Sequence, residues 1–403
     1  MIAQSSKRIY LDHAATTPAR PEVVEAMLPY LSQYGYNPSS LHGEGRRARA
    51  AVDAARETVA RALGARAKEI IFTGGGSEAD NLAILGAARA LRSRGKHIVT
   101  SAIEHHAVLH VVGVLEDEGW EVTVLDADAG GTIDPVGFAN ALRADTTLAS
   151  IMFANNEIGT LQSIECLARI AHNKGILFHT DAVQAPAYVP IDVRSLGVDL
   201  LSISAHKFYG PKGVGALYLR DGIPLAPLIV GGAQEFAKRA GTENVAGIVG
   251  MAHAIEMVLG ELPAVPARIA QLRDRLQSGI LRRVPDVRVN GEGRPRIANN
   301  CNVSFAGVDG EALLIALDLE GIAVSTGSAC ASGTPEPSHV IAALGVAQEW
   351  SRGVVRFSLG RETTQAQIDE TLDTLAMVVA RLRGWGSKKS SFPGNERFAS
   401  GKR

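Results

Sequence analysis

Short apolar runs alternate with helix-length segments through the first two-thirds of the 403-residue sequence, and this alternation constrains the fold more than any other feature. The short runs are rich in β-branched residues, whereas NLAILGAARALRSRG and IECLARIAHNKG carry apolar residues at helical spacing and end in Gly. This order predicts an α/β fold with a mostly parallel central sheet flanked by helices. The last expected strand follows its predecessor too closely for a crossover helix, so we expect it to be antiparallel. The seven expected strands span residues 69–73, 97–101, 121–126, 148–154, 176–182, 200–205 and 214–219.

A second region with a different order of elements begins near residue 262. It is expected to form a smaller α+β domain with strands in VRVNG, NVSFAG, IAVST and VVRFSLG, and with helices at 267–283, 310–320, 337–344 and 365–383. The tail from Gly384 is polar and basic, and we expect it to be poorly ordered. We therefore expect an N-terminal segment that joins the small domain, a large domain, a small C-terminal domain and a tail, at residues 1–15, 16–261, 262–383 and 384–403.

Charge and composition exclude several classes of function. Forty-one basic residues stand against 42 acidic ones, a formal charge of -1, which argues against a groove for a nucleic-acid backbone. The start of the chain lacks the apolar run of a signal peptide, and no apolar stretch is long enough to span a bilayer. The three cysteines are widely separated, without the spacing of a zinc site or a disulfide framework. We expect a soluble, cytoplasmic protein whose partners are small molecules or proteins.

Polar segments follow five of the expected strands. They are GGGSEADN, EHHAVL, NNEIGT, DAVQ and AHKFYGPKG. In an open α/β sheet, ligands bind beyond the carboxyl ends of the strands. The five segments are therefore expected to meet at one ligand.

The segment GGGSEADN is a glycine turn that leads from a strand into a helix. Free N–H groups and the positive end of the helix dipole would face an anion there, with Gly76 and Ser77 nearest to a phosphate. The alternative is a tight turn in which Ser77 caps the helix. This segment alone does not separate the two interpretations.

Lys207 follows an apolar strand directly in SISAHKFYGPKG. Desolvation beside such a core would lower its proton affinity and allow it to form a Schiff base. Most lysines at strand exits are simply exposed. The preceding strand favours a functional lysine, because Asp181 at its end can keep a pyridine nitrogen protonated and so make the ring an electron sink.

Six segments occur in an order that resembles one known family. They are YLDHAATTP, TDAVQ, SAHKFYGPKGVGALYL, KRAGTENV, STGSACASGTPEPSHV and VVRFSLGR. This series resembles the cysteine desulfurases of the NifS/IscS class, which belong to the class-V aminotransferase family and share the pyridoxal-phosphate-dependent transferase fold of type I. The resemblance reaches from about residue 9 to residue 383. It implies a homodimeric pyridoxal 5′-phosphate enzyme that converts L-cysteine to L-alanine and transfers the sulfur.

The resemblance assigns roles around the cofactor ring. Lys207 would form the Schiff base and then move protons at the substrate α-carbon. Asp181 would pair with the ring nitrogen, and Gln184 would reach the phenolic oxygen. His105 would stack on the ring face, whereas His106 beside it is expected to turn away.

The resemblance also assigns residues to the substrate and the phosphate. Asn156 and Arg356 would bind the substrate carboxylate, the arginine through a two-pronged ion pair, and Asn156 would also contact the cofactor. The alternative for Arg356 is a pair with a surface acid. Thr242 would reach the phosphate from the neighbouring subunit. Within one subunit, the phosphate would be held by Gly76, Ser77, Ser204 and His206.

Cys330, in STGSACASG, resembles the sulfur-accepting nucleophile of this family. The small residues around it give the backbone freedom to swing between the substrate and an acceptor protein. Its thiolate would attack the substrate sulfur and become a persulfide. The resemblance implies no intrinsic metal site, although Cys330 could be a transient iron–sulfur ligand. Cys166 and Cys301 are expected to be buried apolar fillers.

Three features depart from the family pattern. Ala237 stands where relatives usually carry Gly, so the loop before Thr242 is expected to be set differently. Ser77 stands in place of Thr and keeps the hydroxyl. The tail after Arg383 does not match the segment with which housekeeping members dock their iron–sulfur scaffold protein. The identity of the sulfur acceptor therefore stays open, with iron–sulfur cluster assembly as the expected pathway.

Other functions remain open from the sequence. A selenocysteine lyase or another β-eliminating lyase would use the same fold and cofactor. An aminotransferase of this fold would yield a keto acid in place of alanine and would need no thiol on a loop. An inactive sulfur-relay or scaffold protein would not need the combination of Lys207, Asp181, His105 and Cys330.

Overall fold

The computed structural model describes residues 8–326 and 338–389, with side chains up to residue 384. The strands in these residues are β1 (Ile9–Tyr10), β2 (Ile70–Thr73), β3 (His97–Ser101), β4 (Glu121–Leu125), β5 (Thr146–Ser150), β6 (Leu177–Asp181), β7 (Leu200–Ser204), β8 (Gly215–Leu219), β9 (Val287–Val289), β10 (Asn300–Phe305), β11 (Ile322–Ala323) and β12 (Val354–Ser358). The longer helices are α1 (Pro21–Leu31), α2 (Gly43–Ala62), α3 (Gly76–Leu91), α4 (His106–Asp117), α6 (Ile164–His172), α9 (Val245–Glu261), α10 (Val265–Arg283), α11 (Gly310–Leu319) and α14 (Gln365–Lys389). The shorter ones are α5 (Pro135–Ala141), α7 (Val193–Leu196), α8 (Gln234–Ala237), α12 (His339–Ala343), α13 (Gln348–Ser351) and the 3-10 turns η1 (Ala67–Glu69) and η2 (Ala205–Lys207).

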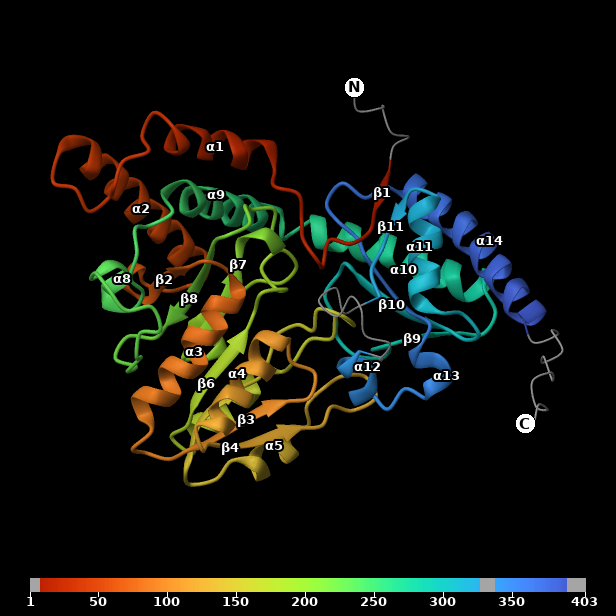
Figure 1. Cartoon of the computed structure of the whole chain (residues 1–403), viewed down its shortest axis with the longest axis horizontal. Coiled ribbons are helices and arrows are strands. Elements are labelled where there is room, and N and C mark those ends of the chain that lie inside the picture. The colour runs from red at the N-terminus through yellow and green to blue at the C-terminus, as the bar shows by residue number, and fades with distance from the viewer. Residues whose placement is uncertain (1–7, 327–337, 390–403) are drawn as a thin grey trace, which may run out of the picture.

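The larger sheet has seven strands in the order β2-β8-β7-β6-β5-β3-β4. The strands from β7 to β4 pair in parallel, while β8 is antiparallel to both of its neighbours. The expectations of a mostly parallel sheet and of one antiparallel strand at 214–219 are therefore confirmed. The connections between the parallel strands bring the carboxyl ends of β3, β5, β6 and β7 to one edge (Figure 1).

Helices cover both faces of this sheet, which explains why its strands are continuously apolar. Side chains of adjacent strand residues point to opposite faces. Ile98 and Leu148 join one buried cluster with α3 and α4, whereas Val99 and Ala149 join the other, with α2, α6 and α9. Figure 1 shows α3 and α4 lying across the sheet on the side that later forms one wall of the site.

A smaller group of elements follows α9. The strands β9, β10 and β12 form an antiparallel sheet in the order β12-β10-β9, and α10, α11 and α14 pack beside it. The N-terminal strand β1 pairs in parallel with β11, and Asp12 forms an isolated bridge with Ser358 of β12 (Figure 1). The backbone before residue 13 therefore lies with the smaller sheet.

Two expected elements have different bounds in the structure. The strand expected at 148–154 is β5 at Thr146–Ser150, because residues 151–154 are buried in a connection and are apolar for that reason. The helix expected to end at 383 is α14, which continues to Lys389. The first six residues of the tail are thus helical, which corrects the expectation for that part. Residues 390–403 lie outside the described residues.

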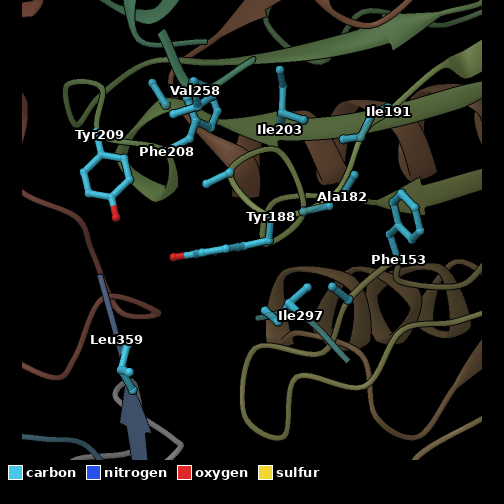
Figure 2. Packing of buried hydrophobic residues seen from close by; sticks show 14 of the residues in the cluster. Phe153, Ala182, Tyr188, Ile191, Ile203, Phe208, Tyr209, Val258, Ile297 and Leu359 are labelled. Atoms are coloured by element: carbon cyan, nitrogen blue, oxygen red, sulfur yellow. The ribbon is translucent and has the colours of Figure 1, made fainter. Parts of the chain in front are cut away.

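The segment after Lys207 is held by buried side chains. Phe208 is fully buried near Val258 of α9, and Tyr209 is 6% exposed (Figure 2). Tyr209 has a φ of 66°, and its backbone N–H donates to Thr17 Oγ1 at 2.6 Å. Its hydroxyl accepts from the backbone N–H of Arg361 at 2.7 Å. These contacts fix the backbone that carries Lys207 and connect it to the loop after β12.

The loop around α8 contains three consecutive non-glycine residues in the left-handed region. Glu235, Phe236 and Ala237 have φ values of 47°, 58° and 59°. This backbone turns Glu235 inward, where its carboxylate accepts from both terminal nitrogens of Arg56 at 2.6 and 2.7 Å. Because a buried pair of charges is stable only when it is well bonded, the pair holds the loop in this conformation. Ala237 therefore has the backbone conformation for which Gly is preferred.

Replacing Ala237 with Gly is expected to raise the free energy of unfolding by about 1 kcal/mol, because Gly removes the cost of a left-handed β-carbon. Ala233 in the same loop is also exposed but has a φ of -83°, so Ala233→Gly is a matched control. That control should lose stability by about 0.5 kcal/mol through added freedom of the unfolded chain. Denaturant unfolding measures both values. Equal losses in the two variants would contradict the assignment of strain to Ala237.

Within the described ranges, no single helix combines the length and apolar character needed to cross a membrane. The helices α9 and α10 satisfy such a test only as a pair, and they are bent by 74° relative to each other.

Candidate active site

Ten of the predicted site residues line one cavity of about 280 Å³ at the carboxyl edge of the larger sheet. They come from the segments that follow β2, β3, β5, β6 and β7, and from β12. The ten residues are Gly76, Ser77, His105, Asn156, Asp181, Gln184, Ser204, His206, Lys207 and Arg356. The structure thus brings together five segments that are far apart in the sequence, together with the arginine of the smaller sheet.

Two predicted residues do not contribute to this cavity. Thr242 is exposed and lines a different pocket, beside Gly213 and Arg239. Its assignment to a site of the neighbouring subunit stays a prediction. Cys330 lies outside the described residues.

Lys207 ends η2, the short turn after β7. Its Nζ donates to the backbone oxygens of Ala14 at 2.7 Å and Ala15 at 2.8 Å. These two carbonyls come from the N-terminal segment, so the amine is held between the larger sheet and the chain that leads to β1. The alternative of a simply exposed lysine is not what the structure shows, because the amine lines the cavity.

The phosphate side of the cavity is formed by the start of α3. Gly75 is the N-cap residue and makes no side-chain hydrogen bond, so the alternative of Ser77 as the cap is wrong. The first N–H groups of this 16-residue helix remain directed at the cavity without a side-chain acceptor. A β-carbon at Gly76 would lie 2.7 Å from Val183, which explains the glycine. Opposite, His206 shares a hydrogen bond of 3.1 Å with Thr16.

Asp181 is the last residue of β6 and is 5% exposed. Its Oδ1 accepts from the backbone N–H of Val183 at 2.8 Å. Burial raises the pKa of its carboxyl, while the positive charge of Lys207 opposes that shift. Gln184 donates to the Ala14 oxygen at 3.0 Å. A buried carboxylate of this kind is best stabilised by a cationic partner in the cavity.

His105 caps α4, and its Nδ1 accepts from the backbone N–H of Ala107 at 3.1 Å. Burial lowers the pKa of this imidazole to about 4, and the charge of Lys207 lowers it further. The ring is therefore neutral near pH 7, with its proton on Nε2. The expectation that His106 turns away is wrong. His106 also lines the cavity, and its ring centroid is 4.6 Å from that of His339.

Arg356 of β12 is 2% exposed, so its side chain is not at the surface. Its Nη1 donates to the backbone oxygen of Asn156 at 2.9 Å, and its Nη2 pairs with Asp12 at 2.8 Å. The alternative of a surface ion pair is wrong, since the contacts lie at the cavity. A guanidinium fixed in this way has the geometry to receive a carboxylate through two hydrogen bonds.

Sequence analysis missed several residues of the cavity. Asp80 lies in GGGSEADN, and Glu157 lies in NNEIGT, so both follow strands that were already singled out. An acid so close to a predicted strand end was the signal that could have found them. The apolar or backbone contributors had no such signal, and they are Ala14, Ala15, Met152, Ala154 and Val183.

The two described cysteines differ in environment. Cys301 of β10 is fully buried, and burial raises the pKa of its thiol to about 12, so the expectation of an inert filler is confirmed for it. Cys166 of α6 is only partly buried and lies 3.9 Å from the Arg169 guanidinium. The expectation of a buried filler is therefore wrong for Cys166.

The family description "Aminotransferase class-V" matches residues 9–371, which is most of the chain. The chain belongs to the class-V aminotransferase family. It is 54% identical over 377 residues to a protein of Dictyoglomus turgidum named "Cysteine desulfurase IscS", covering 94% of this chain and 96% of that one. It is 51% identical to a protein of the same name from Methanosarcina thermophila, covering 95% and 94%.

Solved structures agree with this class-V assignment. A "NIFS-LIKE PROTEIN" superposes with a TM-score of 0.87 at 36% identity, covering 93% of this chain and all of that one. "SspA in complex with cysteine" superposes with a TM-score of 0.79 at 37% identity, covering 88% and 100%. The fold is therefore that of the NifS-like pyridoxal-phosphate enzymes, as predicted.

Pyridoxal 5′-phosphate is the cofactor of these class-V enzymes, and the residues present fit it. The phosphate requires N–H donors, which the uncapped start of α3 offers. The pyridine nitrogen requires a buried acid, which Asp181 offers, and the aldehyde requires an amine, which Lys207 offers. Around them, the other residues that would hold the cofactor are Gly76, Ser77, His105, Gln184, Ser204 and His206.

Proposed function

We propose that the protein is a pyridoxal-phosphate-dependent cysteine desulfurase. It would convert L-cysteine to L-alanine and place the sulfur on Cys330 as a persulfide. The observation that carries the proposal is the meeting of Lys207, Asp181 and Arg356 in one cavity of a chain that is 54% identical to a cysteine desulfurase. These three residues supply an amine, a buried acid and a carboxylate receptor.

Each side chain has a task that follows from its position. Arg356 orients the substrate by its carboxylate, opposite the end of the cavity that holds the amine. Lys207 then moves the proton at the substrate α-carbon, within reach of the two carbonyls that hold its Nζ. His105 is neutral and fixed through Nδ1, so it presents a flat ring face and one N–H donor. When bound, the cofactor supplies an electron sink for the α-carbon, and Asp181 keeps its ring nitrogen protonated.

The sulfur transfer would be completed by Cys330. Its thiolate attacks the substrate sulfur, a sulfur–sulfur bond forms, and the bond from the β-carbon to sulfur breaks. The β-carbon then takes a proton and leaves as alanine. The persulfide would be delivered to an acceptor protein in the cytoplasm, and iron–sulfur cluster assembly is the proposed pathway.

The proposal includes a homodimer. Large apolar side chains are exposed on α1, on the loop after it and on the segment before α8. Leu31, Leu41 and Val230 are 65%, 89% and 82% exposed. Exposed apolar residues that gather on one part of a chain favour a protein interface. Thr242 follows α8 and faces away from the cavity of its own chain, so a partner subunit is the site that it would complete.

The test is the identity of the products. Purified holoenzyme supplied with L-cysteine and a thiol reductant is expected to form alanine and sulfide in equal amounts. An aminotransferase would instead form a keto acid. A rate on selenocysteine at least about 10-fold higher than that on cysteine would favour a selenocysteine lyase. Either of these results would overturn the proposal.

A further inference from the structure

Three buried acids lie around the cavity, and the proposed function uses only one of them. Asp80 of α3, Glu104 before α4 and Asp181 of β6 are 1%, 0% and 5% exposed. Asp80 lines the cavity together with Asp181, and each of the other two acids lies close enough to raise the pKa of its carboxyl through their charge. The question is how two carboxyl groups share one dry site.

A chain of hydrogen bonds leads to Asp80 from the interior of the sheet. Ser150 Oγ lies 2.8 Å from His179 Nδ1, and His179 Nε2 lies 3.0 Å from Ser202 Oγ. The Ser202 hydroxyl is in turn hydrogen-bonded to the Asp80 carboxyl. His179 and Asp181 are two residues apart on β6 and so point to the same face, the face covered by α3. Asp80 is thus placed between this chain and Asp181.

The charges in this place do not balance if both carboxyls are ionised. Within the described residues, the ion-pair partner recorded for Asp80 is the His179 imidazole, at 3.6 Å. Burial lowers the pKa of His179 to about 3, and both of its nitrogens are bonded to hydroxyls, so the ring is neutral. The charge of Lys207 acts on Asp181 instead. An ionised Asp80 would therefore be a buried charge without a counterion beside a second carboxylate, which is very costly.

Glu104 is in a different position from Asp80. Its Oε1 accepts from Ser101 Oγ at 2.5 Å and from the backbone N–H of Met152 at 2.9 Å. Burial raises its pKa to about 8 in spite of these bonds. Glu104 is thus satisfied within its own loop and does not line the cavity, which leaves Asp80 as the acid that faces Asp181 across the site.

We propose that Asp80 is a positioning residue that acts through Asp181. As a neutral acid it fills the space between the serine–histidine chain and Asp181, so that the single negative charge of the pair stays on Asp181, against the ring nitrogen. The inference rests on the proposed function, because it assumes that Asp181 faces a pyridine. Loss of the Asp80 side chain would admit water and weaken the hold of Asp181 on the ring proton.

The test compares the holoenzymes of the wild type, Asp80→Ala and Asp80→Asn. Asp80→Ala is expected to lower kcat by about 10-fold, the scale of lost outer-shell partners, and to change the absorbance of the bound cofactor near neutral pH. Asp80→Asn keeps a neutral group of the same shape, so it should restore the wild-type absorbance and recover most of the lost kcat. Infrared spectra should show one protonated carboxyl group fewer in Asp80→Asn than in the wild type.

Three outcomes would overturn the inference. Asp80→Asn could behave like Asp80→Ala, which would mean that a charge at this position is needed. The two proteins could differ by no protonated carboxyl signal, or Asp80→Ala could keep the wild-type absorbance. The infrared comparison does not depend on turnover. A wild-type protein that forms no alanine would therefore contradict the proposed function, while the carboxyl signal would still decide the protonation of Asp80.

Discussion

Lys207→Ala is expected to lower the turnover of L-cysteine by at least about 10³-fold, since it removes both the covalent attachment and the proton carrier at the α-carbon. The Nζ lies 2.7 and 2.8 Å from two fixed carbonyls in the cavity, so no other side chain can take its place without a change of backbone. Lys212 lies in the exposed loop that follows, and Lys212→Ala is the matched control. Alanine and sulfide formation measure the activity of both variants.

A covalent readout accompanies this activity measurement. Borohydride should fix the cofactor to the wild-type chain and to Lys212→Ala, as detected by the mass of the peptide that contains residue 207. It should leave Lys207→Ala unmodified. A borohydride-stable adduct on Lys207→Ala would show that another amine carries the cofactor, and the assignment of Lys207 would be wrong.

Cys330→Ala is expected to reduce sulfide release to background, a fall of at least about 10²-fold, while the absorbance of the bound cofactor is kept. The described residues nearest to this position are tied to the cavity. Ser325 exchanges backbone hydrogen bonds with Arg356, and Ser338 donates to Glu157 at 2.6 Å. Since five residues span at most about 17 Å, Cys330 stays within that distance of Ser325.

Cys166→Ala is the matched control for this second prediction. Cys166 is partly exposed but lies on α6, away from the cavity, so its loss should leave sulfide release unchanged. Normal turnover in Cys330→Ala would contradict the role of this thiol. The same turnover combined with a loss in Cys166→Ala would move the sulfur acceptor to α6.

The larger sheet could be predicted from the sequence because each strand carries its own apolar signal and each helix its own period. All seven strands were found, and the exception in bounds has a local cause. Residues 151–154 remain apolar after β5 has ended, because they are buried as a connection. Periodicity reports burial, and it does not separate a strand from a buried loop.

The candidate site was predicted through polar residues at strand ends, and this rule was only partly sufficient. It found Asp181 and Lys207, whose neighbours in sequence are apolar strands. It did not find Asp80, which looks like an ordinary acid in the first turns of a helix. Its importance depends on burial against β6 and β7, which only tertiary packing supplies. The conformation of Ala237 was hidden for a related reason, since the buried Arg56–Glu235 pair imposes it.

The route of the N-terminal chain has a thermodynamic consequence. Its backbone is paired with β11 at Ile9 and Tyr10, and a few residues later its carbonyls receive the lysine amine. A tilt of the smaller sheet relative to the larger one would lengthen those two bonds. By linkage, whatever occupies the amine must bias that tilt by the same free energy with which the tilt alters the occupancy.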